Sequence, residues 1–153
     1  MELRRRLRTV YDATALAEPL ARGAPFPGIE ALLNHLRGRL PAVVVTNKPP
    51  DLAVAVLEAA GLRQHFLHVH GPTRRQERKP EPFLLAAAAT TLGIAAGDLL
   101  MVGDSLADLG AAAAAGCPVA FAAWGYGKPG ARERYPNSLP LTHPLDLLGL
   151  LAD

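Results

Sequence analysis

Short apolar runs alternate along this chain with stripes of apolar residues at helical spacing. Beyond residue 25, short segments that are rich in apolar residues and typical of strands occur at 42–45, 66–70, 98–102 and 118–122, and the β-branched run at 42–45 suits a buried parallel strand. Apolar residues spaced as on one face of a helix occur at 28–39, 51–60, 82–92 and 106–115. Strands that alternate with helices predict an α/β fold with a doubly wound, Rossmann-like parallel sheet.

Residues near the helix ends support this pattern. Asp51 is placed to cap the second helix, and Gly61 follows its expected end. The alanine run at 111–115 is expected to be structural, because alanine favours helix and lets a helix lie close against a sheet. Residues 3–20 are also helical in pattern and a linker rich in proline and glycine follows them. We therefore expect an appendage at 1–24 and an α/β core at 25–153.

The composition is that of one globular domain. The chain has 153 residues, half of them apolar and a fifth charged, which is enough for a sizeable core. The net charge of +2 is too small to indicate a nucleic-acid or membrane partner, and no aromatic residues interleave with Arg4, Arg5, Arg6 and Arg8. Cys117 is the only cysteine, and no run reaches the ~18 apolar residues of a membrane span. These features predict a cytoplasmic protein.

Polar residues follow the first expected strand directly. Thr46 and Asn47 offer a hydroxyl and a carboxamide, and they stand in a loop that enters a helix. Ligands of open α/β sheets bind beyond the carboxyl ends of the strands, where such groups can hold a phosphate by several hydrogen bonds. Threonine and asparagine are also common as ordinary turn and cap residues at this place.

Charged residues follow the second and third expected strands. Lys79 lies in RKPEP next to a proline and is a candidate to bind an anion. Asp104 and Asp108 follow the third strand four residues apart, with Gly103 before them allowing a tight bend. They are hard oxygen donors of the kind that Mg²⁺ prefers, although carboxylates also cap helices. The order of these groups, each after a successive strand, favours a joint site for a metal and a phosphate.

Several stretches together carry a resemblance to a known family. They are PFPGIEALL at 25–33, VVVTNKP at 43–49, RKPEP at 78–82 and MVGDSLADLGAAAAAGC at 101–117, and WGYG at 124–127 continues the likeness. On these motifs the chain resembles the haloacid dehalogenase-like hydrolase superfamily, and within it the phosphoglycolate phosphatase branch. The likeness covers nearly everything from residue 25 onward.

This resemblance implies a magnesium-dependent phosphate monoester hydrolase that acts on a small phosphorylated metabolite, with 2-phosphoglycolate the first substrate to test. It assigns Thr46 and Asn47 to holding the transferring phosphoryl group and Lys79 to balancing charge. It assigns Asp104 to binding Mg²⁺, and Asp108 to supporting the metal directly or through water.

One part of the family pattern is absent from these 153 residues. Members attack phosphate with an aspartate in a D-x-D-G-T segment after an N-terminal strand, and no such segment occurs here. Asp12, in TVYDAT, lacks the second aspartate and the glycine. The resemblance implies that residues 2–20 correspond to the last helix of a helical cap. It also implies that a central strand is missing between those at 43–45 and 99–102, which would leave two strand edges unpaired.

Three explanations of the missing strand stay open. The chain is a fragment or a wrongly started reading frame of the enzyme, a short protein whose flanking strands pair directly, or a chain that receives the strand from another molecule. We favour the first, and expect the chain alone to be inactive. The alternative function is a non-catalytic phosphate-binding or regulatory domain, and the open edges make self-association a further expectation.

Two other features of the sequence are weaker signals. His68 and His70 fall on the same face of a strand and could share a metal, but no third ligand is near in the sequence, which favours a strand-end role. Trp124 and Tyr126 follow the fourth strand, where they would line the mouth of the site or the edge of the core.

Overall fold

The strands form two separate parallel sheets. The computed structural model describes residues 24–128 and 130–151. Strand β1 (Val44–Val45) pairs with β2 (Val69–His70), and a second sheet has the order β3 (Met101–Gly103), β4 (Val119–Ala122) and β5 (Leu139–Leu141). All three strand pairs are parallel. Residues 1–23 of the expected appendage, with its arginines and Asp12, lie outside the described residues.

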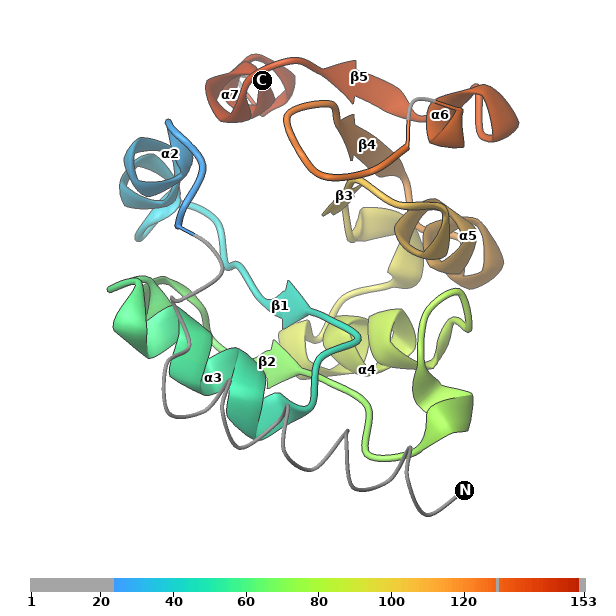
Figure 1. Ribbon diagram of the computed structural model, residues 1–153, viewed down its shortest axis with the longest axis horizontal. Coiled ribbons are helices and arrows are strands. Elements are labelled where there is room, and N and C mark those ends of the chain that lie inside the picture. The colour runs from blue at the N-terminus through green and yellow to red at the C-terminus, as the bar shows by residue number, and fades with distance from the viewer. Residues whose placement is uncertain (1–23, 129, 152–153) are drawn as a thin grey trace, which may run out of the picture.

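Within the described residues, β1 and β3 are not hydrogen-bonded to each other, and each lies at the edge of its own sheet (Figure 1). Direct pairing of these two strands, one of the three explanations above, is therefore not what the structure shows. The sheets are joined by helices instead. Val43 and Val45 at β1 and Met101 in β3 belong to one apolar cluster with residues of α4 (Phe83–Leu92) and α5 (Leu106–Ala115).

Helices cover both sides of the strands, which confirms the doubly wound α/β architecture (Figure 1). Ala120 in β4 packs with α2 (Ile29–Leu36) and α7 (Leu147–Leu150). Its neighbour Phe121 packs instead with α5 and α6 (Ala131–Arg134), because successive side chains of a strand point to opposite faces. The remaining long helix, α3 (Pro50–Ala59), contacts β2.

Small residues let the helices approach the sheet closely. Ala88 in α4 and Ala111 and Ala112 in α5 are completely buried in the cluster that also holds Cys117. The expectation that the alanine run is structural is confirmed. Burial also raises the pKa of the Cys117 thiol.

Most expected elements are present but shorter. The strand expected at 66–70 is regular only over Val69–His70, because the 3₁₀ turn η1 (Arg63–His65) precedes it. Asp51 does not cap α3; Pro49 is the N-cap and Asp51 lies in the first turn. The fifth strand, β5, was not expected because it is short and contains Pro140. Proline is tolerated there because β5 is the edge strand of its sheet.

No helix in the described part of the chain is both long enough and apolar enough to span a lipid bilayer.

Candidate active site

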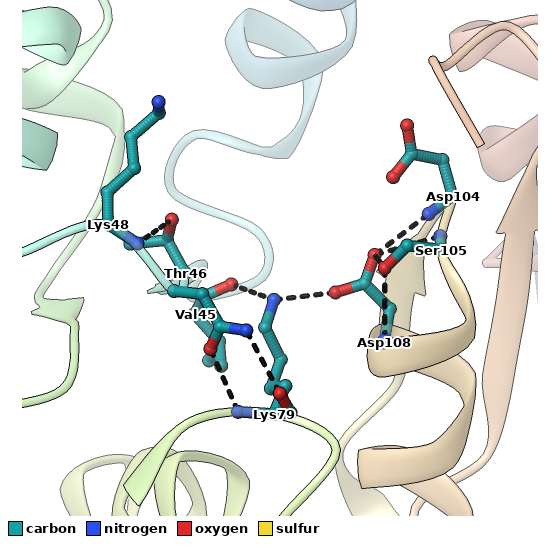
Figure 2. A network of polar contacts seen from close by, with 8 residues as sticks. Val45, Thr46, Lys48, Lys79, Asp104, Ser105 and Asp108 are labelled. Carbon is teal, nitrogen blue, oxygen red and sulfur yellow. Dashed lines mark hydrogen bonds and ion pairs between the residues drawn. The ribbon is translucent and has the colours of Figure 1, made fainter. Parts of the chain in front are cut away.

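Loops that follow three strands meet at one rim of the molecule (Figure 2). Thr46 follows β1, Lys79 stands in the connection from β2 to α4, and Asp104 follows β3. A chain of contacts joins these loops through the Lys79 side chain and the carboxylate of Asp108. The expectation that these residues lie together is confirmed, whereas their chemical roles stay predictions.

The Lys79 side chain spans the space between the two sheets. Its Nζ donates a 2.8 Å hydrogen bond to the carbonyl oxygen of Val45 in β1 and a 2.6 Å bond to Oδ1 of Asp108 in α5. Only 8% of the lysine side chain and 10% of the aspartate side chain are exposed. Lys79 is therefore a fixed, buried cation and not the solvated surface lysine that a charged loop also allows.

Asp108 is the third residue of α5 and closes the start of that helix. Its Oδ2 accepts hydrogen bonds from the backbone N–H groups of Asp104 and Ser105 at 3.0 and 3.1 Å and from the Ser105 hydroxyl at 2.9 Å. In return, Ser105 Oγ accepts the Asp108 N–H, which completes a capping box. Both carboxylate oxygens thus have partners.

Burial alone would raise the pKa of Asp108. This effect is outweighed by the positive charge and hydrogen bond of Lys79 and by the hydrogen bonds from Ser105. The pKa of Asp108 therefore lies below its usual value of 3.8. Gly103 makes this arrangement possible, because a Cβ there would lie 2.6 Å from Oδ2 of Asp108. Its φ is not positive, so this glycine serves close approach and not the tight bend expected from the sequence.

Asn47 binds the backbone of Lys79. Its Oδ1 accepts the Lys79 N–H at 2.8 Å, and its Nδ2 donates to the Lys79 carbonyl oxygen at 3.0 Å. The carboxamide therefore fixes the lysine loop against the loop after β1. Thr46 Oγ1 accepts the N–H of Lys48 at 3.1 Å, which leaves the threonine hydroxyl free to donate to a ligand.

Asp104 points away from Asp108 (Figure 2). Its Oδ2 accepts the backbone N–H of Tyr126 at 2.6 Å, and its Oδ1 accepts no hydrogen bond from the described residues. Gly125 and Gly127 lie directly against Asp104, and a Cβ at either position would collide with it. The WGYG loop thus holds Asp104 through its backbone. The signal for this in the sequence was the pair of glycines, not the aromatic side chains.

The two aromatic residues of that loop differ in position. Trp124 packs against the apolar cluster of Leu32 and Leu141, at the edge of the core. Tyr126 is 82% exposed and its ring centroid lies 5.2 Å from that of Phe26. Only the backbone of Tyr126 therefore contacts the predicted site residues.

The carboxylate oxygens of Asp104 suit a magnesium ion better than a transition metal. Asp104 has one carboxylate oxygen without a protein partner in the described chain, and it stands at the open end of β3. Mg²⁺ is typically held by one or two carboxylates, with water and substrate phosphates completing its shell. Among the residues searched, no three His, Cys, Asp or Glu side chains gather closely enough to hold a metal. Asp104 thus fits a direct ligand, and Asp108 fits a group that fixes the backbone of Asp104.

His68 and His70 lie next to each other, with ring centroids 4.3 Å apart. His70 is buried, and its burial, together with the neighbouring His68, lowers its pKa below 6.5. His68 precedes β2 (Val69–His70), so only His70 lies in the strand, and no third His, Cys, Asp or Glu joins the pair in the described chain.

Comparisons with known proteins agree with these features. A family model described as haloacid dehalogenase-like hydrolase matches residues 2–116. A phosphoglycolate phosphatase from Rhodospirillum rubrum is 42% identical over 112 residues, which are 72% of this chain and 46% of that protein. One from Escherichia coli (strain K12) is 37% identical over 120 residues, or 78% of this chain and 45% of that protein. The chain thus spans about half the length of these curated relatives.

Solved structures show the same fold. A haloacid dehalogenase-like family hydrolase from Streptococcus pneumoniae superposes with a TM-score of 0.81 at 22% identity, covering 94% of this chain and 66% of that one. A protein described as a predicted phosphoglycolate phosphatase from Haemophilus somnus superposes with a TM-score of 0.74 at 28% identity, covering 82% and 56%.

Proposed function

Because the chain belongs to the haloacid dehalogenase-like hydrolase family, we propose that it forms the phosphate- and magnesium-binding part of a phosphate monoester hydrolase. The observation that carries this proposal is the buried Lys79–Asp108 pair, which links the end of β1 to the Asp104 loop after β3. The substrate is a small phosphorylated metabolite. The names of the curated relatives make 2-phosphoglycolate the first candidate.

In this proposal the phosphoryl group binds between Thr46 and Lys79. The Thr46 hydroxyl and the backbone N–H of Asn47 donate hydrogen bonds to its oxygens, and the Lys79 ammonium balances their negative charge. Lys79 is held in advance by Asn47, Val45 and Asp108, so the lysine needs little reorganisation when charge develops. Preorganised donors of this kind are commonly the largest single contribution to catalysis.

Mg²⁺ would be held by Asp104, whose orientation depends on the Tyr126 N–H and on Asp108. When bound, the ion withdraws negative charge from the phosphoryl oxygens. Asp108 keeps its own negative charge because its pKa is lowered. It can therefore hold Lys79 and the start of α5 in place throughout the neutral pH range.

The attacking carboxylate is not among these 153 residues, since the sequence contains no D-x-D-G-T segment. In the family that segment follows a strand between those corresponding to β1 and β3, which are not paired with each other in the described chain. We therefore propose that residues 25–153 are the hydrolase core without its nucleophile and that residues 1–24 derive from the cap. A cytoplasmic location and self-association through open strand edges also stay predictions.

A turnover assay tests this proposal. The 153-residue chain is incubated with 2-phosphoglycolate and Mg²⁺, and released phosphate is measured beside the Asp104→Asn variant. We expect no release above that of the variant, because no carboxylate is placed to attack phosphorus. Sustained Mg²⁺-dependent release that Asp104→Asn abolishes would show that another group in this chain supplies the nucleophile.

A non-catalytic phosphate-binding or regulatory domain is the alternative, and the absent nucleophile is the observation that favours it. Both functions require phosphate to bind at Thr46 and Lys79. They differ in whether a D-x-D-G-T segment is encoded in frame upstream of Met1. Finding that segment would support the hydrolase, and its absence from the gene would support the binding domain.

A further inference from the structure

Three arginines line a pocket beside the proposed phosphate site. Arg74, Arg75 and Arg78 belong to the connection between β2 and α4, and with Asn47 and Thr73 they border a pocket of about 360 Å³. No acidic side chain lines this pocket. A neighbouring pocket of about 480 Å³ shares Asn47, Arg75 and Arg78 and is also lined by Lys79. The arginine pocket therefore adjoins the proposed phosphate site.

The positive charge of this pocket is not neutralised within the described chain. Among the described residues, no carboxylate lies within 4.0 Å of the three guanidinium groups, and the arginine side chains donate no hydrogen bond. The nearby acid, Glu77, is engaged elsewhere: it accepts the backbone N–H groups of Thr73 and Arg74 at 2.8 and 3.3 Å. Glu77 thereby fixes the 3₁₀ turn η2 (Arg75–Glu77), and of the three arginines only Arg74 has a charge that lowers the pKa of Glu77.

We propose that Arg75 and Arg78, with Arg74, form a second anion subsite that binds the anionic group at the far end of the substrate from its phosphate. The inference rests on the proposed function and assigns the substrate class as small phosphate monoesters with a second anionic group. That group is a carboxylate or a second phosphoryl group, both of which match the forked geometry of guanidinium. Glu81 lines the neighbouring pocket and not the arginine pocket, so we place the second anion in the arginine pocket.

Ligand binding to the 153-residue chain tests the subsite without turnover. Backbone amide shifts are followed by NMR in the presence of Mg²⁺ with four probes: ethyl phosphate, 2-phosphoglycolate, ethane-1,2-diyl bisphosphate and glycolate. The variants are Arg75→Gln/Arg78→Gln and, as the matched control, Arg37→Gln. Arg37 is an exposed arginine at the end of α2, on another part of the molecule from η2.

We expect ethyl phosphate to shift residues 46–48 only, and at least one doubly anionic probe to shift both 46–48 and 73–78. That probe should bind about tenfold more tightly than ethyl phosphate, as expected for one added charge-assisted contact. The double variant should lose this advantage and keep its affinity for ethyl phosphate, and the Arg37 variant should keep both. If 2-phosphoglycolate gains more affinity than the bisphosphate, the subsite recognises a carboxylate; the reverse order indicates a phosphoryl group.

Other outcomes would overturn the subsite and the proposed function separately. The subsite is wrong if neither doubly anionic probe gains affinity, or if the double variant weakens ethyl phosphate by the same factor. It is also wrong if ethyl phosphate or glycolate alone shifts 73–78 as strongly as the doubly anionic probes, because the arginines would then attract any anion. If no phosphate probe shifts 46–48, the proposed function fails, whatever happens at 73–78.

Discussion

Replacing Lys79 by methionine is expected to lower the free energy of unfolding by about 3 kcal/mol. Removing one partner of a buried ion pair leaves the other charge uncompensated, which typically costs 3–5 kcal/mol. The lower end applies here because Ser105 still donates two hydrogen bonds to Asp108. The variant also removes the contact between the β1 loop and α5 that bridges the two sheets. Urea denaturation followed by circular dichroism measures the change.

Lys48→Met is the matched control. Lys48 is exposed, lies one residue after Asn47 and makes no ion pair with the described residues, so its replacement should change stability by less than ~0.5 kcal/mol. The double variant Lys79→Met/Asp108→Asn should be less destabilised than the two single changes predict together, because neither charge is then left alone. Additive effects, or equal effects of Lys48→Met and Lys79→Met, would contradict the role given to the pair.

The stability that Lys79 provides should also depend on pH. The pKa of Asp108 is lowered in the folded chain, so its contribution is fully present above its ordinary value near 3.8. It is lost as the pH falls through the lower, folded pKa. In Lys79→Met the burial of Asp108 is no longer offset by the lysine charge, so the pKa of Asp108 should lie above its value in the native chain, and the variant should regain stability as this carboxylate is protonated. The difference in stability between the native chain and Lys79→Met should therefore be largest near neutral pH and shrink as the pH falls; a difference that grows on acidification would contradict this assignment.

Gly127→Ala is expected to displace the Asp104 loop. A Cβ at this position would overlap the backbone carbonyl oxygen of Asp104. A change of side-chain rotamer cannot relieve this overlap, so the loop itself has to move. Overpacking of this kind typically costs about 1–3 kcal/mol. The hydrogen bond from Tyr126 to Asp104 should be lost with it, and Mg²⁺ affinity should fall about tenfold, as when a group that orients a metal ligand is removed.

Gly97→Ala provides the control for this substitution. Gly97 lies in the 3₁₀ turn η3 (Ala96–Asp98), and its φ is not positive. A methyl group added there would have no other atom within 4 Å. Its replacement should leave stability and Mg²⁺ affinity nearly unchanged. If Gly127→Ala behaves in the same way in thermal unfolding and Mg²⁺ titration, the WGYG loop does not hold Asp104.

The order of the elements could be predicted from the sequence because short apolar runs and helical stripes alternate clearly. The lengths of the strands could not be predicted, because a regular strand needs a neighbouring strand to pair with. In the described chain β1 and β3 each have such a neighbour on one edge only. Strand β5 was missed because Pro140 argues against a strand, and only the finished sheet shows that it occupies an edge.

The site could be located from the sequence, but the partners of its side chains could not. Polar residues after successive parallel strands must meet at one rim, which places Thr46, Lys79 and Asp104 together. The contacts of Asn47 with the Lys79 backbone join residues 32 positions apart, and no local pattern encodes them. The composition of the charged loop at 71–81 indicates a functional or mobile segment, but it does not show which of the basic side chains line one pocket.

Titration of the 153-residue chain with Mg²⁺ by calorimetry, in the presence of inorganic phosphate, tests most directly whether these loops form a metal and phosphate site. We expect one Mg²⁺ site whose affinity falls at least tenfold in Asp104→Asn. Glu58 is an exposed acid in α3, and the Glu58→Gln variant should bind Mg²⁺ as the native chain does. Equal Mg²⁺ affinity in Asp104→Asn and the native chain, or no Mg²⁺ binding by the folded native chain, would contradict this expectation.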